Sequence, residues 1–230
     1  MVKAIVLSGG SGSRMKSKTK KQYMLLQGKP LIYYSLHTFC ESSVDEVILV
    51  ASPEDMEYCQ KEIIDKYSLY KVKTIAPAGS ERYESVYNGL KAVGSADVVL
   101  VHDGARPFVT TDMIERSVET AEKFGSAICA MPVKDTIKTA DKNCVVTSTP
   151  DRSTLWQIQT PQTFSYPLLT ECYEKIMSTD PTGITDDAMI VERASDKKIH
   201  LIEGSYTNIK VTTPEDMAVA EAFLRLSQGI

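Results

Sequence analysis

The chain has 230 residues, of which 43% are apolar and 24% are charged, and its formal net charge is −4. These values are typical of one folded domain and exclude wholesale disorder, and the negative charge argues against general nucleic-acid binding. No segment approaches the ~20 apolar residues of a membrane span, and the apolar run at residues 4–7 is too short for a signal peptide. We therefore expect a soluble, cytoplasmic, single-domain protein (residues 1–230) without nucleic-acid or membrane partners.

Strands and helices alternate along the first half of the chain. Short apolar runs predict strands at 3–7, 46–51, 72–75 and 98–102. Helical spacing, with Pro30 in the first turn of one helix and Ser52-Pro53 opening another, predicts helices at 30–40, 52–67, 80–90 and 111–124. Alternation of this kind predicts an α/β fold with a mainly parallel sheet and helices on both faces. Near the end, Thr213 and Pro214 predict the N-cap and first residue of a last helix.

Residues 135–151 interrupt this alternation. They are polar, rich in Thr and Val, and carry a turn signal at 140–143, which predicts a β-hairpin. An isolated two-stranded hairpin is only marginally stable in water. We therefore expect this hairpin to pack against a second copy of the chain.

Two loops follow predicted strands and are candidates for a binding site. The glycine loop from Gly9 to Arg14 follows the first strand, and the segment from His102 to Arg106 follows the strand at 98–102. Ligands of parallel sheets bind beyond the carboxyl ends of the strands, so both loops are expected at one edge. The loop matches neither GxGxxG nor GxxxxGK[ST], but a glycine-rich turn can offer backbone N–H groups to an anion.

The first 40 residues carry bases and no acid: Lys3, Arg14, Lys16, Lys18, Lys20, Lys21 and Lys29. A basic run alone is more often a solvated face than a site. Asp103 is suited to hold Mg²⁺, although an Asp before glycine is equally typical of a turn, and Arg106 is also explained as a surface ion-pair partner. Together with the glycine loop, these residues indicate a site for a metal-bound triphosphate.

The sequence lacks other common catalytic patterns. It contains no GxSxG motif and no CxxC pair, and its five cysteines are odd in number and widely spaced, which disfavours a disulfide framework and a zinc site. Nucleotidyl transfer to an acceptor that is already an anion needs no general base, only positioning and charge neutralisation. The sequence is consistent with that chemistry.

Seven motifs occur in order along nearly the whole chain: SGGSGSRM, KKQY, VHDGARPF, PVKDTIK, LWQIQTPQTF, ITDDA and SYTNIKVTTPEDM. As a set they resemble the 2-C-methyl-D-erythritol 4-phosphate cytidylyltransferases of the non-mevalonate isoprenoid pathway. The resemblance implies a Rossmann-like homodimer that uses Mg²⁺ to convert CTP and methylerythritol phosphate into 4-diphosphocytidyl-methylerythritol and pyrophosphate. It also implies a β-arm, at about residues 135–157, that is used in dimerisation.

The resemblance implies roles for individual residues. Those that would bind the nucleotide are Ser8, Gly9, Gly10 and Gly12 of the loop, with Gly79, Ser80 and Ser85. Arg14 and Lys21 would neutralise the α-phosphate, Lys210 would bind a further phosphate, and Asp103 would hold the metal ion. The methylerythritol phosphate pocket would contain Arg106, Thr160, Thr185 and, from the partner's arm, Thr136 and Arg152.

Three positions depart from the usual family pattern. Ser8-Gly9 stands where Ala-Ala is common, which backbone recognition is expected to tolerate; Ser80 stands where Asp is frequent; and Lys20 replaces a usual Pro or Asn. The related ribitol 5-phosphate cytidylyltransferases are the nearest rival family, although HDGARPF and the Trp of LWQIQTPQ look more like the isoprenoid enzymes. The glycine loop is also compatible with a catalytically silent nucleotide sensor and, more distantly, with a dehydrogenase.

Overall fold

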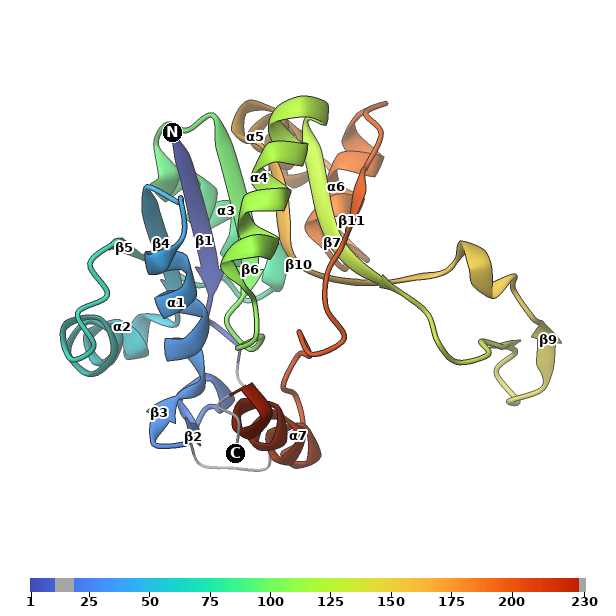
Figure 1. Cartoon of the computed structure of the whole chain (residues 1–230). Coiled ribbons are helices and arrows are strands. Elements are labelled where there is room, and N and C mark those ends of the chain that lie inside the picture. The colour runs from blue at the N-terminus through green and yellow to red at the C-terminus, as the bar shows by residue number, and fades with distance from the viewer. Residues whose placement is uncertain (11–18, 228–230) are drawn as a thin grey trace.

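The computed structural model describes residues 1–10 and 19–227, and its centre is one seven-stranded sheet (Figure 1). The strands in spatial order are β11 (Leu201–Glu203), β7 (Ser126–Pro132), β10 (Trp156–Ser165), β6 (Val98–Asp103), β1 (Val2–Leu7), β4 (Glu46–Ala51) and β5 (Val72–Pro77). Every neighbouring pair is parallel except the two pairs that β10 makes with β6 and β7. The expected mainly parallel sheet is therefore confirmed.

Helices cover both faces of this sheet, as predicted. Those on one face are α1 (Leu31–Glu41), the helical stretch made of η3 (Pro53–Asp55), α2 (Met56–Tyr58) and the π-helical η4 (Cys59–Asp65), and α4 (Thr111–Phe124). Those on the other are α3 (Arg82–Val93), α5 (Tyr166–Met177) and α6 (Asp187–Ala194). The strands between the two layers are buried on both sides, which explains the continuous apolar runs of β4 and β6.

Helix α4 has the bounds that the sequence predicts, because both of its ends are capped. The Thr110 side chain accepts a hydrogen bond from the Met113 N–H at 3.2 Å. Gly125 ends the helix at φ 86°, a left-handed conformation that glycine adopts without a Cβ penalty. Helix α3 begins at Arg82, two residues later than expected, and Pro30 is the N-cap of α1 rather than part of its first turn.

Helix α7 (Pro214–Ser227) lies outside the two layers, next to the small hairpin of β2 (Leu25–Leu26) and β3 (Lys29–Pro30). Buried Leu26 and Ala220 belong to the apolar cluster between them. The predicted cap is confirmed, since the Asp216 N–H donates to Thr213 Oγ1 at 3.4 Å. None of the helices in the described ranges is both long and apolar enough to cross a membrane.

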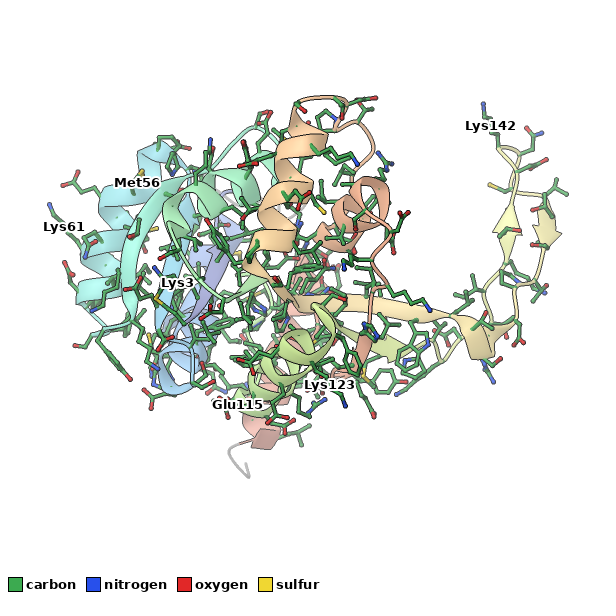
Figure 2. All side chains as sticks on the ribbon, turned by 90° about the horizontal axis from the view of Figure 1, so that it is seen from above. Lys3, Met56, Lys61, Glu115, Lys123 and Lys142 are labelled. Carbon is green, nitrogen blue, oxygen red and sulfur yellow. The ribbon has the colours of Figure 1, made fainter. Side chains whose placement is uncertain are left out.

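A hairpin arm projects from the body of the molecule between β7 and β10. Figure 2 shows it reaching away from the sheet, with Lys142 at its tip. Its strands are β8 (Thr139–Ala140) and β9 (Val146–Ser148), followed by the short helix η5 (Arg152–Thr154). The predicted hairpin is thus confirmed, although Trp156 and Gln157, at the end of the expected arm, already pair with β7.

Candidate active site

Two cavities adjoin each other beyond the carboxyl ends of β1 and β6. The first, of about 200 Å³, is called the glycine-loop cavity and is lined by Leu7, Gly9, Gly10, Lys21, Gly79, Ser80, Glu81, Arg82, Ser85, Asp103, Gly104, Ala105 and Lys210. The second, of about 180 Å³, is called the β10 cavity and is lined by Arg82, Asp103, Arg106, Ile158, Gln159, Thr160, Gln162, Thr185, Asp186 and Lys210. The two loops expected at one edge therefore do meet there. Arg82, Asp103 and Lys210 line both cavities.

The described part of the glycine loop is held from behind by Gln22, which belongs to the KKQY motif but has no role predicted from the sequence. Its Nε2 donates to the Ser8 carbonyl at 2.6 Å and to the Gly10 carbonyl at 3.3 Å, and the side chain is only 2% exposed. The Gly9 carbonyl accepts from Ser52 Oγ at 3.2 Å. Ser8 itself is buried beneath the loop rather than lining the cavity. Gly12 and Arg14 lie outside the described residues.

Lys20 and Lys21, at the start of the short helix η2 (Lys21–Tyr23), have different surroundings. Lys21 lines the glycine-loop cavity. Lys20 Nζ instead lies 2.7 Å from both Glu54 Oε1 and Asp55 Oδ2, at the start of the helical stretch after β4. Lys20 therefore joins the start of η2 to the helical stretch that begins at Pro53.

The segment from Gly79 to Ser85, which the resemblance predicts to bind the nucleotide, is ordered by its own side chains. The Gly79 N–H donates to Ser85 Oγ at 3.0 Å, and Ser85 Oγ donates to the Glu81 carbonyl at 3.1 Å. The N–H and the hydroxyl of Ser80 both donate to Glu84 Oε2, at 2.7 and 2.6 Å, and these bonds lower the pKa of Glu84. Ser80 is exposed at the wall of the glycine-loop cavity, and its hydroxyl is used to order the start of α3.

Asp103 ends β6 with its carboxylate between two cations. Oδ1 lies 3.3 Å from Arg82 Nε and Oδ2 lies 2.7 Å from Lys210 Nζ. Burial by itself raises the pKa of a carboxyl group, but the charges of Arg82 and Lys210 outweigh it and hold the pKa of Asp103 well below its usual range. The carboxylate is therefore ionised at neutral pH.

Arg82 is the main site residue that sequence reasoning missed. Its Nη1 and Nη2 donate to the two oxygens of Asp187 at 3.1 and 2.7 Å, and Asp187 is completely buried. The Tyr173 hydroxyl donates to Asp187 Oδ1 at 2.6 Å. The ITDDA motif contains Asp187, but nothing in the sequence pairs this residue with Arg82, which is 105 positions earlier.

A chain of hydrogen bonds determines the proton positions at His102 and Thr160. His102 Nε2 faces the Arg106 carbonyl at 3.1 Å, so it carries the hydrogen, and Nδ1 accepts from Thr160 Oγ1 at 3.1 Å. Thr160 Oγ1 in turn accepts from the Asp103 N–H at 3.1 Å. Burial lowers the pKa of His102 to about 4, so the ring is neutral. Thr160 thus fixes the end of β6 from inside the wall of the β10 cavity.

Arg106 also lines the β10 cavity. Its Nη1 donates to the Asn208 carbonyl at 2.7 Å and its Nη2 to the Ile158 carbonyl at 3.4 Å. Burial lowers the pKa of this guanidinium. Its buried Nε has no hydrogen-bond partner among the described residues. Exposed Thr185 lies at the rim of the same cavity.

The remaining two expected site residues, Thr136 and Arg152, lie on the arm and line neither cavity. Arg152 Nη1 donates to the Lys134 carbonyl at 2.8 Å, within the base of the arm. A single chain therefore does not bring these two residues to Asp103.

The Asp103 carboxylate fits a metal ion whose other ligands would be water and the phosphate oxygens of a bound nucleotide. The described residues contain no group of three or more His, Cys, Asp or Glu side chains placed to bind a metal. Mg²⁺ needs no such cage, because it usually takes one or two carboxylates and completes its shell with water and phosphate oxygens. One ionised carboxylate at the junction of two cavities meets that requirement.

Comparison with known proteins agrees with this geometry. The family model described as 2-C-methyl-D-erythritol 4-phosphate cytidylyltransferase matches residues 2–226. Proteins of that name from Lachnoclostridium phytofermentans and Lachnospira eligens are 47% and 49% identical to the chain, over 99% and 96% of it and 97% and 98% of their own lengths.

Solved structures show the same relationship. The 4-diphosphocytidyl-2C-methyl-D-erythritol synthase of Anaerococcus prevotii superposes with a TM-score of 0.85 at 33% identity, over 97% of this chain and 96% of that one. The 2-C-methyl-D-erythritol 4-phosphate cytidylyltransferase of Thermus thermophilus gives 0.78 at 28% identity, over 96% and 98%. The chain belongs to the 2-C-methyl-D-erythritol 4-phosphate cytidylyltransferase family.

Proposed function

We propose that the chain transfers a cytidylyl group from CTP to 2-C-methyl-D-erythritol 4-phosphate, which yields 4-diphosphocytidyl-2-C-methyl-D-erythritol and pyrophosphate. The observation that carries this proposal is the position of Asp103 and Lys210 in the shared wall of two cavities. One cavity has glycine-loop walls suited to a nucleotide, and the other has Arg106 and Lys210 for a second phosphate. The reacting phosphates would meet at the wall between them.

CTP is assigned to the glycine-loop cavity. The backbone of Gly9 and Gly10 faces it, and Lys21 supplies a positive charge beside the phosphates. Because the Ser85 hydrogen is directed to the Glu81 carbonyl, the hydroxyl can only accept a further hydrogen bond from a ligand. An acceptor suits the exocyclic amine of cytosine and disfavours the carbonyl of uracil.

The transfer needs no general base. The acceptor phosphate is already an anion, and it attacks the α-phosphorus in line while the bond to the β-phosphate breaks and pyrophosphate leaves with the electron pair. Arg14 and Lys21 are assigned to the charge that develops on the α-phosphate, and Lys210 and Arg106 to the acceptor phosphate. His102 takes no part, because both ring nitrogens are engaged inside the fold.

Asp103 is assigned as the residue that would hold Mg²⁺. The ion, when bound, neutralises part of the triphosphate charge and orients its oxygens. Arg82 and Asp187 support this assignment, because they keep the carboxylate fixed in the wall that both cavities share.

We further assign Thr136 and Arg152 to the β10 cavity of a partner subunit in a homodimer. The arm and the adjoining end of β10 expose the apolar side chains of Ile137, Val145, Val146, Trp156 and Ile158. Exposed apolar side chains on a hairpin with no core of its own are typical of an interface. The arm would thus both join the subunits and complete the acceptor site.

We assign the chain to the cytoplasm, a reducing compartment, because its cysteines form no disulfides. All five are free thiols, and four of them are buried. Disulfides are rare in reducing compartments, where such thiols persist.

The function is tested by measuring pyrophosphate release from CTP with a panel of acceptors in the presence of Mg²⁺. We expect turnover with methylerythritol phosphate and far less with ribitol 5-phosphate, and CTP is expected to be preferred over UTP. Exclusive use of ribitol 5-phosphate would overturn the substrate assignment. Binding of CTP without pyrophosphate release from any acceptor would indicate a nucleotide sensor, and binding of NAD would indicate a dehydrogenase.

A further inference from the structure

The two cations that contact Asp103 are held very differently. Arg82 reaches Asp103 Oδ1 with Nε at 3.3 Å, while its two terminal nitrogens are occupied by Asp187. Asp187 is completely buried and also bound by the Tyr173 hydroxyl. Arg82 therefore cannot leave Asp103 without breaking a buried, bidentate ion pair, and it is a permanent partner of Oδ1.

Lys210 is held at a single point. Its Nζ lies 2.7 Å from Asp103 Oδ2, which is the one polar contact of this ammonium group within residues 1–10 and 19–227, and its side chain is 37% exposed. The backbone beside it is anchored separately, because the Val211 N–H donates to the Ala105 carbonyl at 2.9 Å. A flexible four-carbon stem can thus move the ammonium group while the backbone stays in place.

Asp103 Oδ2 cannot serve a lysine and a divalent cation at the same time. An ammonium group and a dication on one carboxylate oxygen would lie within a few ångströms of each other and repel strongly. Oδ1 is kept by Arg82, so Oδ2 is the oxygen that can be given to a metal ion. Lys210 lines both cavities and therefore has space to move into after release.

We propose that Lys210 is an exchangeable counter-ion: it neutralises Asp103 Oδ2 in the empty site and releases this oxygen to a divalent cation, which leaves its ammonium group available for the acceptor phosphate. This inference deepens the proposed function and rests on it. It makes Lys210 a residue that links occupation of the metal site to preparation of the acceptor site. It also predicts that the free enzyme binds divalent metal weakly, because the metal must displace a bound cation.

The first test measures binding of Mn²⁺ alone to the free protein by electron paramagnetic resonance, with no CTP and no acceptor present. The variant is Lys210→Met, which keeps the length of the side chain and removes its charge, and the charge-matched control is Lys20→Met. Opposite charges at this range change the proton affinity of a carboxylate by ~10- to 1,000-fold. We expect Lys210→Met to bind Mn²⁺ at least about tenfold more tightly than the wild type, and Lys20→Met to bind it like the wild type. Equal affinities in all three proteins would overturn the proposal.

The second test follows the lysine itself. The wild-type protein is labelled with an amine-reactive reagent, with and without Mn²⁺ at concentrations that saturate the resonance signal, and each lysine is quantified by mass spectrometry. Labelling of Lys210 is expected to increase severalfold with Mn²⁺, while Lys20, paired with Glu54 and Asp55, serves as the internal reference. Unchanged labelling of Lys210 in the metal-saturated protein would show that no displacement occurs.

Both tests are independent of catalysis. They contain neither substrate, so a failed displacement leaves the assignment of CTP and methylerythritol phosphate intact. A failed turnover assay with normal displacement would, in turn, overturn the proposed function alone. Thermal unfolding of Lys210→Met confirms that the variant used in the binding test is folded.

Discussion

Gly9 and Ala78 share a space that holds one methyl group: a Cβ placed on Gly9 would lie 2.3 Å from the Cβ of Ala78. Ala78 cannot retreat easily, because its N–H donates to the Ala51 carbonyl at 2.8 Å. The glycine of the loop and the alanine after β5 are therefore matched to each other. An alanine at this loop position would not fit this chain without a second change.

The first prediction tests this match. Gly9→Ala is expected to destabilise the protein by ~1–3 kcal/mol, as overpacking does, and to weaken CTP binding because the loop must shift. Gly9→Ala combined with Ala78→Gly is expected to restore both, measured by denaturant unfolding and by calorimetric titration with CTP. Gly10→Ala is the matched control for the unfolding measurement, since a Cβ there meets no atom of residues 1–10 and 19–227 within 4 Å. Additive losses in the double variant would contradict the steric explanation.

The second prediction separates two adjacent lysines. Lys21→Ala is expected to lower kcat by ~10²- to 10³-fold, the usual cost of removing one preorganised charge at a transition state. Lys20→Ala is expected to leave kcat nearly unchanged and to cost at most ~1 kcal/mol of stability, because its ion pairs with Glu54 and Asp55 are partly exposed. Steady-state kinetics and urea unfolding check both. Similar kinetic losses in the two variants would indicate diffuse electrostatic attraction instead.

The third prediction concerns pH. The pKa of His102 is lowered by burial from 6.5 to about 4, so the unfolded state binds more protons than the folded state between these values. Stability is then fully present above pH 6.5 and declines by roughly 3 kcal/mol as the pH falls toward 4. Urea unfolding of the wild type and of His102→Gln between pH 4.5 and 7 measures this slope. His102→Gln is expected to lose this pH dependence of stability. If the slope is the same in the variant, the pH dependence comes from other groups.

The fourth prediction concerns the anchor of Arg82. Asp187→Asn leaves a guanidinium facing a neutral group inside the protein, which is expected to cost ~3 kcal/mol of unfolding free energy. Tyr173→Phe removes one hydrogen bond to the same carboxylate and is expected to cost ~1–2 kcal/mol. Denaturant unfolding measures both variants, with Asp180→Asn, a change at an exposed carboxylate, as the control. A loss in Asp187→Asn no larger than in this control would show that the ion pair does not anchor Arg82.

The fifth prediction tests the arm in the dimer. Lys21→Ala and Arg152→Ala homodimers are each expected to be nearly inactive with methylerythritol phosphate. After unfolding and refolding of an equal mixture, about one quarter of the wild-type activity is expected, because half of the dimers are mixed and each contains one intact site. Activity that stays at the level of the parents would place Arg152 in the site of its own chain.

The four strands β1, β4, β5 and β6 could be predicted because their signals are local. Strand β4 and helix α4 have the expected bounds, since a buried apolar run and a capped amphipathic segment need no information from elsewhere. Strand β10 escaped prediction because it contains Pro161 and several polar side chains, which argue against a central strand. These polar groups are satisfied by distant partners, such as Thr163 Oγ1, which donates to Ser117 Oγ at 2.9 Å.

The same distinction holds for the site. Gly9, Gly10 and Asp103 come directly after predicted strands, and Lys21 belongs to the KKQY motif, so these residues could be named from the sequence. Arg82 could not, because its role depends on Asp187, which is 105 positions further along the chain. The role of Gln22 could not be predicted either, because it depends on the hydrogen bond from its side-chain amide to the Ser8 carbonyl, which only the structure shows.

The late position of Lys210 in the chain has a consequence for biosynthesis. Asp103 closes a strand formed before the midpoint of the chain, whereas the cation on its Oδ2 belongs to the last connection before α7. A growing polypeptide on the ribosome therefore presents the glycine loop and Asp103 long before Lys210 is translated. A product that stops before Lys210 would have Arg82 and Asp103 in the wall that the two cavities share but would lack the cation on Asp103 Oδ2, so this wall is complete only after Lys210 has been translated.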